Sequence, residues 1–382
     1  MRYLTAGESH GPKLVGILEG APAGAVINKE KIDEALQERQ KGPGRGGRMK
    51  IERDQVQILS GIRGGKTTGG PIALEIINRD WANWEKIMAW GSDADLESRK
   101  VITPRPGHAD LTGYLKYRTE VRNVLERASA RETAMRVAIG NIARQLLENL
   151  GVEIRGQVLA VGKVQANLQD TEDHWQRVKT SEWKVGDPEA EKALYAQVEE
   201  ARAKGESLGG WLQVQVLNLP PGLGSYAQWD RKLDGRLAQA VLSIQAFKGV
   251  SFGMGFEAGR TFGSQVHDPI AYEEGRGYYR LSNNAGGLEG GMTNGEPVII
   301  EGVMKPIPTL YSPLETVNLL TKEVEEASVE RSDVCAVPAA LVVMEHVVAW
   351  EILQAVLDKF PSDTWEELHK AWQEYKIYLS EQ

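Results

Sequence analysis

Cysteine is nearly absent from this sequence, in which Cys335 is the single example among 382 residues. One cysteine excludes an internal disulfide and a metal site built from several thiolates. Long apolar runs are also lacking, because the longest one, Val334 to Met344, is half of the roughly 20 residues that a membrane helix needs. The first residues contain no apolar stretch typical of a signal peptide. We therefore expect a cytoplasmic protein with no membrane segment.

Basic residues are in the minority, with 45 lysines and arginines against 53 aspartates and glutamates, for a net charge of −8. This balance argues against nucleic acid or an anionic membrane as partner. The length allows two or three domains or one large one, and no linker-like segment divides the chain. We predict a single domain over 1–382, in which the charged stretch 163–207, poor in large aliphatic residues, forms an excursion or flap.

The common metal and nucleotide signatures are missing as well. No H-E-x-x-H or H-x-x-x-H pair indicates a metal site, so none is expected. No G-x-G-x-x-G follows a predicted strand. Gly65-Lys66-Thr67 ends like a P-loop, but Ser60 stands where that pattern needs glycine. An NTP-dependent phosphotransferase using this loop is one rival hypothesis, and a flavin- or anion-binding protein without turnover is another.

Glycine is what the sequence has in excess, with 41 in 382 residues, about 11% against a usual share of about 7%. The glycines cluster within 42–47, 61–70 and 286–295. The first two clusters lie in or beside the segment Arg39 to Lys66, which holds eight basic and two acidic residues. Glycine lets the backbone approach a ligand, and arginine binds phosphate or carboxylate with two parallel hydrogen bonds. The segment predicts an anion site, and a solvated basic loop is the alternative.

Hydrophobic periodicity and capping signals predict a mixed α and β protein. Helices are expected over 29–40 (capped by Asn28), from a Ser129–Glu132 capping box to Gly151, over about 230–248, after a second capping box at 312–315, and after Pro338. Strands are expected at 56–59, 72–77, 211–217 and 297–303.

Two histidines and one aspartate are candidates for proton transfer. His10 lies in a turn of small residues, and His108 in a stiff Pro/Gly loop, so both side chains are expected to be accessible. Asp333 directly precedes an apolar run, where partial burial would suit a base. A turn or cap role is the alternative for each of the three residues.

Two serines are further candidates. Ser129 begins a helix between Arg127 and Arg131, which suits an anion as well as it suits simple capping. Ser9 adjoins His10 but lacks the G-x-S-x-G context of a hydrolase nucleophile. Together these residues indicate chemistry on a small molecule with several negative charges.

Seven segments, in order along nearly the whole chain, resemble the motifs of the chorismate synthase family. They are Gly7-Glu8-Ser9-His10-Gly11, Arg39 to Arg48, Ser60 to Ile72, Arg105 to Asp110, Arg127 to Thr133, Asn283 to Gly291 and Arg331 to Ala340. The resemblance implies an α+β fold, a single-domain β-α-β sandwich of antiparallel sheets with helices between them, assembled as a homotetramer. It also implies the last common step of the shikimate pathway, the 1,4-anti elimination of phosphate from 5-enolpyruvylshikimate 3-phosphate. The family needs reduced FMN without net redox change, and since no reductase module is recognised, an external source of reduced flavin is expected.

The resemblance also assigns roles to particular residues. His10 matches the proton donor to the leaving phosphate, His108 the residue that protonates reduced flavin, and Asp333 the aspartate linked to removal of the C6 hydrogen. Ser9 and Ser129 match proton relays. Substrate-binding positions match Arg39, Arg45, Arg48, Arg131 and Arg331. Flavin-contacting positions match Arg127, Ala128, Ser129, Gln245, Ala246, Gly290, Lys305, Pro306, Ile307, Pro308, Thr309 and Arg331.

Overall fold

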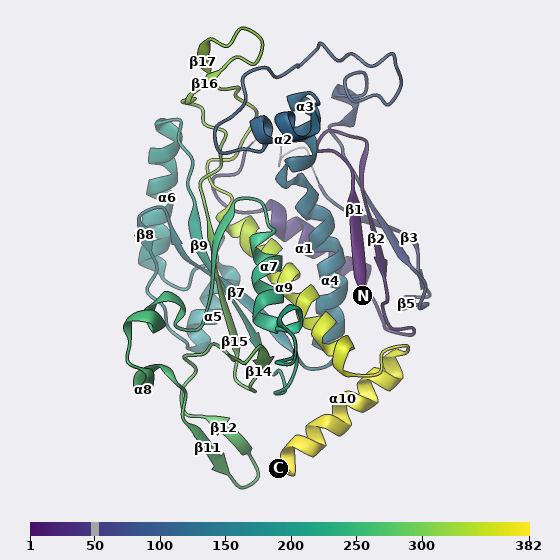
Figure 1. The fold of residues 1–382 in the computed structure, drawn as a ribbon, viewed down its shortest axis with the longest axis vertical. Coiled ribbons are helices and arrows are strands. Elements are labelled where there is room, and N and C mark those ends of the chain that lie inside the picture. Colours follow the sequence, from purple (N-terminus) through teal and green to yellow (C-terminus); the bar gives the residue numbers. More distant parts are fainter. Residues whose placement is uncertain (47–52) are drawn as a thin grey trace.

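The structure is a computed structural model that describes residues 1–46 and 53–382. Two antiparallel sheets face each other across a layer of helices (Figure 1). The first sheet has the order β1-β2-β6-β3, made of β1 (Arg2–Ala6), β2 (Lys13–Glu19), β6 (Ile72–Ile77) and β3 (Val56–Ser60). The second has the order β10-β15-β9-β7-β8, made of β10 (Phe247–Phe252), β15 (Val298–Met304), β9 (Gly210–Leu217), β7 (Glu153–Val161) and β8 (Val164–Gln165).

Four helices fill the space between the sheets: α1 (Lys29–Gln40), α4 (Thr133–Asn149), α7 (Leu233–Leu242) and α9 (Val337–Lys359). Helix α4 packs on β2, where Gly16 leaves room for Met135 and Ile139. Helix α9 packs on β7 and β9, where Gly156 admits the side chain of Leu341. This arrangement confirms the predicted α+β class with helices between antiparallel sheets.

Helices α4 and α9 cross closely at Gly140. A Cβ at this position would lie 2.4 Å from the carbonyl oxygen of His346. Helix propensity alone favours alanine by about 1 kcal/mol, but here we expect Gly140→Ala to lower the free energy of unfolding by about 1–3 kcal/mol, because the helices must separate. Urea unfolding measures this change. Gly235→Ala in α7 is the matched control. Apart from its chain neighbours and its own helix backbone, no atom of the described residues lies within 4 Å of the Cβ position at Gly235. Stabilisation by both variants would contradict the prediction.

Several predicted elements are confirmed. Helix α1 has the expected bounds, and the Asn28 side chain accepts a hydrogen bond from the Lys31 N–H. The helix after Pro338 is α9, and the four predicted strands are β3, β6, β9 and β15 within one residue at each end. Helix α4 begins later than expected, because the Ser129 hydroxyl accepts from the Arg131 N–H in a separate turn and Glu132 binds Thr5 instead of closing a capping box.

One predicted helix is shorter than expected, and one helix prediction is wrong. The helix expected over 230–248 ends at Leu242, because Ala246 has a left-handed backbone (φ +70°) and Phe247 begins β10, paired with β15. The capping box at 312–315 precedes strand β16 (Glu315–Val317), which pairs with β17 (Val324–Glu326). Pairing with the distant strand β15 overrode the helix signal beyond Leu242, and at 315–317 a local hairpin with β17 formed in place of a helix.

Residues 163–207 contain β8, α5 (Glu172–Thr180) and α6 (Pro188–Ala203). Although the surface of this stretch is charged, Trp183 and Leu194 belong to the main hydrophobic core. The prediction of an excursion or flap was based on composition alone. Composition does not show whether the two tryptophans and the few aliphatic residues of this stretch pack into the core.

Helix α9 is long and apolar enough to cross a membrane by length and composition. The apolar-run criterion missed it, since Glu345 and His346 interrupt the run. Of its most apolar window, 78% is buried inside the protein, so packing between the sheets accounts for its composition.

The remaining elements surround this sandwich. Helices α2 (Asp110–Tyr117) and α3 (Val121–Ala128) cover the end where α4 begins, and α10 (Trp365–Ser380) lies at the opposite end (Figure 1). The short elements are β4 (Ile62–Arg63), β5 (Lys66–Thr67), α8 (Gly263–Val266), β11 (Ile270–Glu273), β12 (Gly277–Arg280), β13 (Leu288–Glu289) and β14 (Met292–Thr293).

Candidate active site

A cavity of about 1050 Å³ opens at the end of the sandwich where α4 and α9 begin. Its volume is at the upper end of the roughly 300–1,000 Å³ typical of ligand sites. Thr133 at the start of α4 and Ala336 just before α9 both line it. The positive ends of two helix dipoles therefore add to its preference for anions.

Basic side chains dominate the cavity wall. Among the described lining residues ten are basic, namely Arg39, Arg45, Arg99, Lys100, Arg105, Arg122, Arg131, Lys248, Lys305 and Arg331. Three are acidic, namely Asp80, Glu330 and Asp333. An acidic protein thus contains a strongly basic hollow, as expected for a site that binds a ligand with several negative charges.

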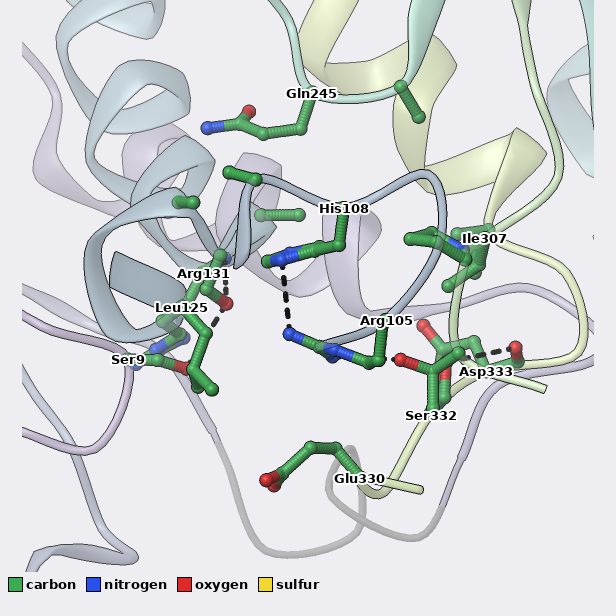
Figure 2. Close-up of a pocket in the computed structure, with 18 of the residues that line it drawn as sticks. Ser9, Arg105, His108, Leu125, Arg131, Gln245, Ile307, Glu330, Ser332 and Asp333 are labelled. Carbon is green, nitrogen blue, oxygen red and sulfur yellow. Dashed lines mark hydrogen bonds between the residues drawn. The ribbon is translucent and has the colours of Figure 1, made fainter. Parts of the chain in front are cut away.

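Most predicted site residues meet at this cavity. The lining includes Ser9, His10, His108, Ser129, Asp333, Arg39, Arg45, Arg131, Arg331, Ala128, Gln245, Ala246, Lys305, Ile307, Pro308 and Thr309. In Figure 2, Ser9 and Arg131 lie on one side, Ile307 and Asp333 on the other, with His108 and Arg105 between them.

Four predicted residues are not placed in the wall. Arg48 lies outside the described residues. Arg127 is exposed and donates hydrogen bonds to the carbonyls of Thr5 and Gly7. Pro306 and Gly290 are not among the lining residues, and Gly290 lies in the turn between β13 and β14.

His10 is held in the β1–β2 loop by residues of three other segments. Its Nδ1 lies 2.8 Å from Oε1 of Glu126 in α3, and its ring stacks on Trp84 with centroids 3.8 Å apart. Asn78, which follows β6, donates to the Gly11 carbonyl at 2.6 Å and so fixes the loop. The Ser9 hydroxyl lies 3.1 Å from that of Ser129, which brings the two predicted relays into contact.

His108 is held by a second buried carboxylate. Its Nδ1 lies 2.5 Å from Oδ1 of Asp110, and Arg105 donates to Oδ2 of the same carboxylate at 2.9 Å. Burial by itself would raise the pKa of Asp110, but hydrogen bonds from His108 and Arg105 hold it well below the usual range. Arg105 also donates to the Thr309 hydroxyl, which links this loop to the 305–309 segment.

Removing the Asp110 charge tests this network. We expect Asp110→Asn to lower the free energy of unfolding by about 3 kcal/mol at pH 7, since a buried Arg105 loses its partner. A carboxylate whose pKa is lowered by folding stabilises the folded state. This stabilisation is fully present above the pKa of the unfolded chain, about 3.9, and it is lost as the pH falls from there through the lower pKa of the folded state. The gap between wild type and variant should therefore shrink between pH 7 and pH 3 in urea unfolding, and an equal gap at both would contradict the assignment.

Arg39 and Arg131 are anchored beneath the cavity. Arg131 donates to Asp54 at 2.6 Å and to Asn78 at 2.8 Å, and Arg39 donates to the Ala130 carbonyl and the Thr133 hydroxyl. Burial, together with the nearby Arg131 and Arg45, lowers the pKa of Arg39 to about 10, so it stays protonated at neutral pH. These two arginines form a fixed positive floor.

Arg45 and Asp333 form the opposite wall. The Arg45 Nη1 lies 2.9 Å from Oδ2 of Asp333, and the Gly46 N–H donates to Oδ1 at 2.6 Å. Gly46 has no room for a side chain, since a Cβ would lie 2.7 Å from the Ser332 carbonyl oxygen. The basic loop after α1 is thereby joined to the segment before α9, which places a carboxylate beside an arginine at the cavity.

Comparison with known proteins supports one family. The family pattern described as chorismate synthase matches residues 1–357. The chain is 82% identical over 381 residues to a chorismate synthase of Desulfitobacterium hafniense strain Y51, with 100% of both chains covered. It is 54% identical to one of Brevibacillus brevis, with 99% of both covered. A crystal structure of chorismate synthase, 41% identical, superposes with a TM-score of 0.80 over 100% of this chain and 98% of the other.

The chain belongs to the chorismate synthase family. Membership makes it a lyase of aromatic biosynthesis, as the seven motifs predicted. The structure also contradicts the rival hypothesis of a phosphotransferase. Gly65 to Thr67 lie in the β4–β5 hairpin, and the next described element is strand β6, where a P-loop would continue into a helix.

The cavity fits the flavin that this family implies. At the cavity wall, Gln245 has a buried side-chain oxygen with no hydrogen-bond partner among the residues that the structure describes. Leu125, Ile244, Phe247 and Ile307 supply apolar surface for a ring system. Lys305 supplies positive charge for a phosphate. Burial and the charge of the neighbouring Lys248 lower the pKa of Lys305. An unpaired acceptor, apolar walls and cations are what a flavin mononucleotide needs.

Several residues that hold the site in place were not predicted from the sequence, among them Glu126, Asp110, Trp84, Asp54 and Asn78. Two left a signal: Asp110 follows His108 by two positions, and Arg122 precedes Glu126 by four on one helix face. The others act through contacts that chain spacing does not reveal.

Proposed function

We propose that this chain binds 5-enolpyruvylshikimate 3-phosphate in the basic cavity and eliminates phosphate from it to give chorismate. The observation that carries this proposal is the combination of ten basic lining residues with two histidines, each hydrogen-bonded to a buried carboxylate. A substrate with one phosphate and two carboxylates needs such a lining. Expelling phosphate needs an acid, and removing a C–H proton needs a base.

In this proposal the arginines bind and orient the substrate. Arg39 and Arg131 form the floor, and Arg45 and Arg331 lie on the side of Asp333. His10 gives a proton to the departing phosphate as its C–O bond breaks, with Ser9 and Ser129 relaying protons. Asp333 is the carboxylate linked to loss of the C6 hydrogen, and His108 holds a proton on the flavin side.

Reduced FMN is the cofactor we propose, and when bound it lends electron density to the substrate and recovers it, so no net redox change occurs. Gln245, Ala246, Lys305 and Thr309 are the residues we propose to hold it. The reduced flavin comes from an external source. We further propose a homotetramer in the cytoplasm, and light scattering on the purified protein tests the tetramer.

Turnover is tested by anaerobic incubation with reduced FMN and 5-enolpyruvylshikimate 3-phosphate. Chorismate is followed by absorbance and phosphate by a coupled assay, and both should appear in equal amounts. Reactions without flavin or with oxidised FMN serve as controls and should give no product. Absence of product from folded protein would overturn the proposal, and tight flavin binding in the same preparation would then favour a flavin-binding protein without turnover.

A further inference from the structure

We propose that Glu126 is a positioning residue for His10, setting the orientation and the protonated nitrogen of its ring, with Trp84 as the surface against which the ring lies. This inference rests on the proposed function, in which His10 is the acid. Glu126 and Trp84 are not among the motif residues that the resemblance assigned.

Glu126 holds both the side chain and the backbone of His10. Its Oε1 lies 2.8 Å from the His10 Nδ1, and its Oε2 accepts the His10 backbone N–H at 2.8 Å. The Glu126 carbonyl accepts the Ser9 N–H at 2.9 Å. An ionised carboxylate only accepts hydrogen bonds, so Nδ1 carries a proton. Any proton that His10 gives to a ligand therefore leaves from Nε2.

The charge of Glu126 is secured by its surroundings. The side chain is fully buried, which by itself would raise the pKa of Glu126, but hydrogen bonds from His10 and the charge of Arg122 lower it below the usual value. Arg122 contacts Glu126 at 3.4 Å and donates to Glu330 and to the Arg99 carbonyl. The carboxylate thus stays negative at a fixed place beside the His10 ring.

Trp84 fixes the plane of the ring. The indole and the His10 imidazole lie 19° from parallel, and the Arg99 guanidinium carbon lies over the indole, 4.0 Å from the ring centroid. The indole N–H donates to Asp80 at 3.2 Å, and Trp84 is only 2% exposed. Among the described residues, the charged groups packed around the His10–Trp84 pair include Glu126, Arg122, Arg99 and Asp80. Stacking prevents the ring from swinging, and Glu126 sets its rotation.

Glu126→Gln tests the inference, because the amide keeps the size but loses the charge and one acceptor oxygen. We expect kcat to fall about tenfold, a part of what a general acid contributes, with the dissociation constant for substrate unchanged. Glu75→Gln is the matched control: Glu75 is a mostly buried carboxylate on β6 that pairs with Lys13 and does not line the cavity.

A double-mutant cycle separates positioning from mere stability. If Glu126 acts through His10, Glu126→Gln should cost nothing further in a His10→Ala background. An equal loss in both backgrounds would overturn the inference. Should Glu126→Gln fail to fold, Trp84→Leu and Trp84→Phe replace it. The leucine variant should lose kcat only when His10 is present, and the phenylalanine variant should retain most of it; wild-type kcat for the leucine variant would overturn the inference. If wild-type protein forms no chorismate, the proposed function fails instead.

Discussion

His10→Ala should lower kcat by about 10²- to 10⁴-fold, the usual contribution of a general acid. The leaving phosphate would depart without a proton donor, while the arginines that bind it remain. The dissociation constant for 5-enolpyruvylshikimate 3-phosphate should therefore be unchanged. Stopped-flow turnover under anaerobic conditions gives kcat, and calorimetry with oxidised FMN gives the dissociation constant without turnover.

His369→Ala is the matched control for this variant, because His369 is exposed on α10, at the far end of the molecule from the cavity. It should behave as wild type. Near-normal kcat for His10→Ala would mean that the proton comes from elsewhere, and the roles of Ser9 and Ser129 would have to be reassigned with it.

Arg45→Ala should weaken substrate binding by about 10- to 100-fold, because a hydrogen bond to a charged group contributes about 1.5–3 kcal/mol. Asp333 is a second cause of weaker substrate binding. In the variant its carboxylate no longer has the Arg45 guanidinium 2.9 Å away, so its negative charge repels an anionic substrate. Calorimetry with oxidised FMN measures the change directly.

Arg45→Lys separates these two causes, because lysine keeps the positive charge but cannot form the bidentate hydrogen bonds of a guanidinium. Its affinity should lie between those of wild type and the alanine variant. Arg202→Ala, at an exposed position on α6, is the control for loss of one positive charge. Unchanged affinity in Arg45→Ala would remove Arg45 from the anion site.

The sequence predicted elements best where the signal and the structure are both local. Helix α1 begins at its Asn28 cap, and β6 spans Ile72–Ile77 as its β-branched run indicates. Helix predictions differed from the structure where strand pairing competed with a helix signal. The capping box at 312–315 precedes the local hairpin of β16 and β17 and not a helix. Beyond Leu242 the chain leaves the predicted helix, and β10 pairs with β15, which is distant in sequence.

The same distinction holds for the site. His10, His108 and Asp333 could be singled out from their loops and from the family motifs. The carboxylate that holds His10 could not be derived in the same way. Glu126 lies 116 positions from His10, and in sequence it is one of 53 acidic residues. Its importance comes from complete burial beside one imidazole and one guanidinium.

By themselves, the acidic balance and the glycine-rich basic segment predicted a small anionic ligand, and the single cysteine excluded an internal disulfide and a metal site of several thiolates. The ordered motifs determined the family. Only the tertiary structure decided which charges meet, since Arg45 reaches Asp333 and Arg131 reaches Asp54 across the fold. The physical reason is that spacing along the chain sets local conformation, whereas the strength of a charge depends on burial and on neighbours that only folding brings within hydrogen-bond distance.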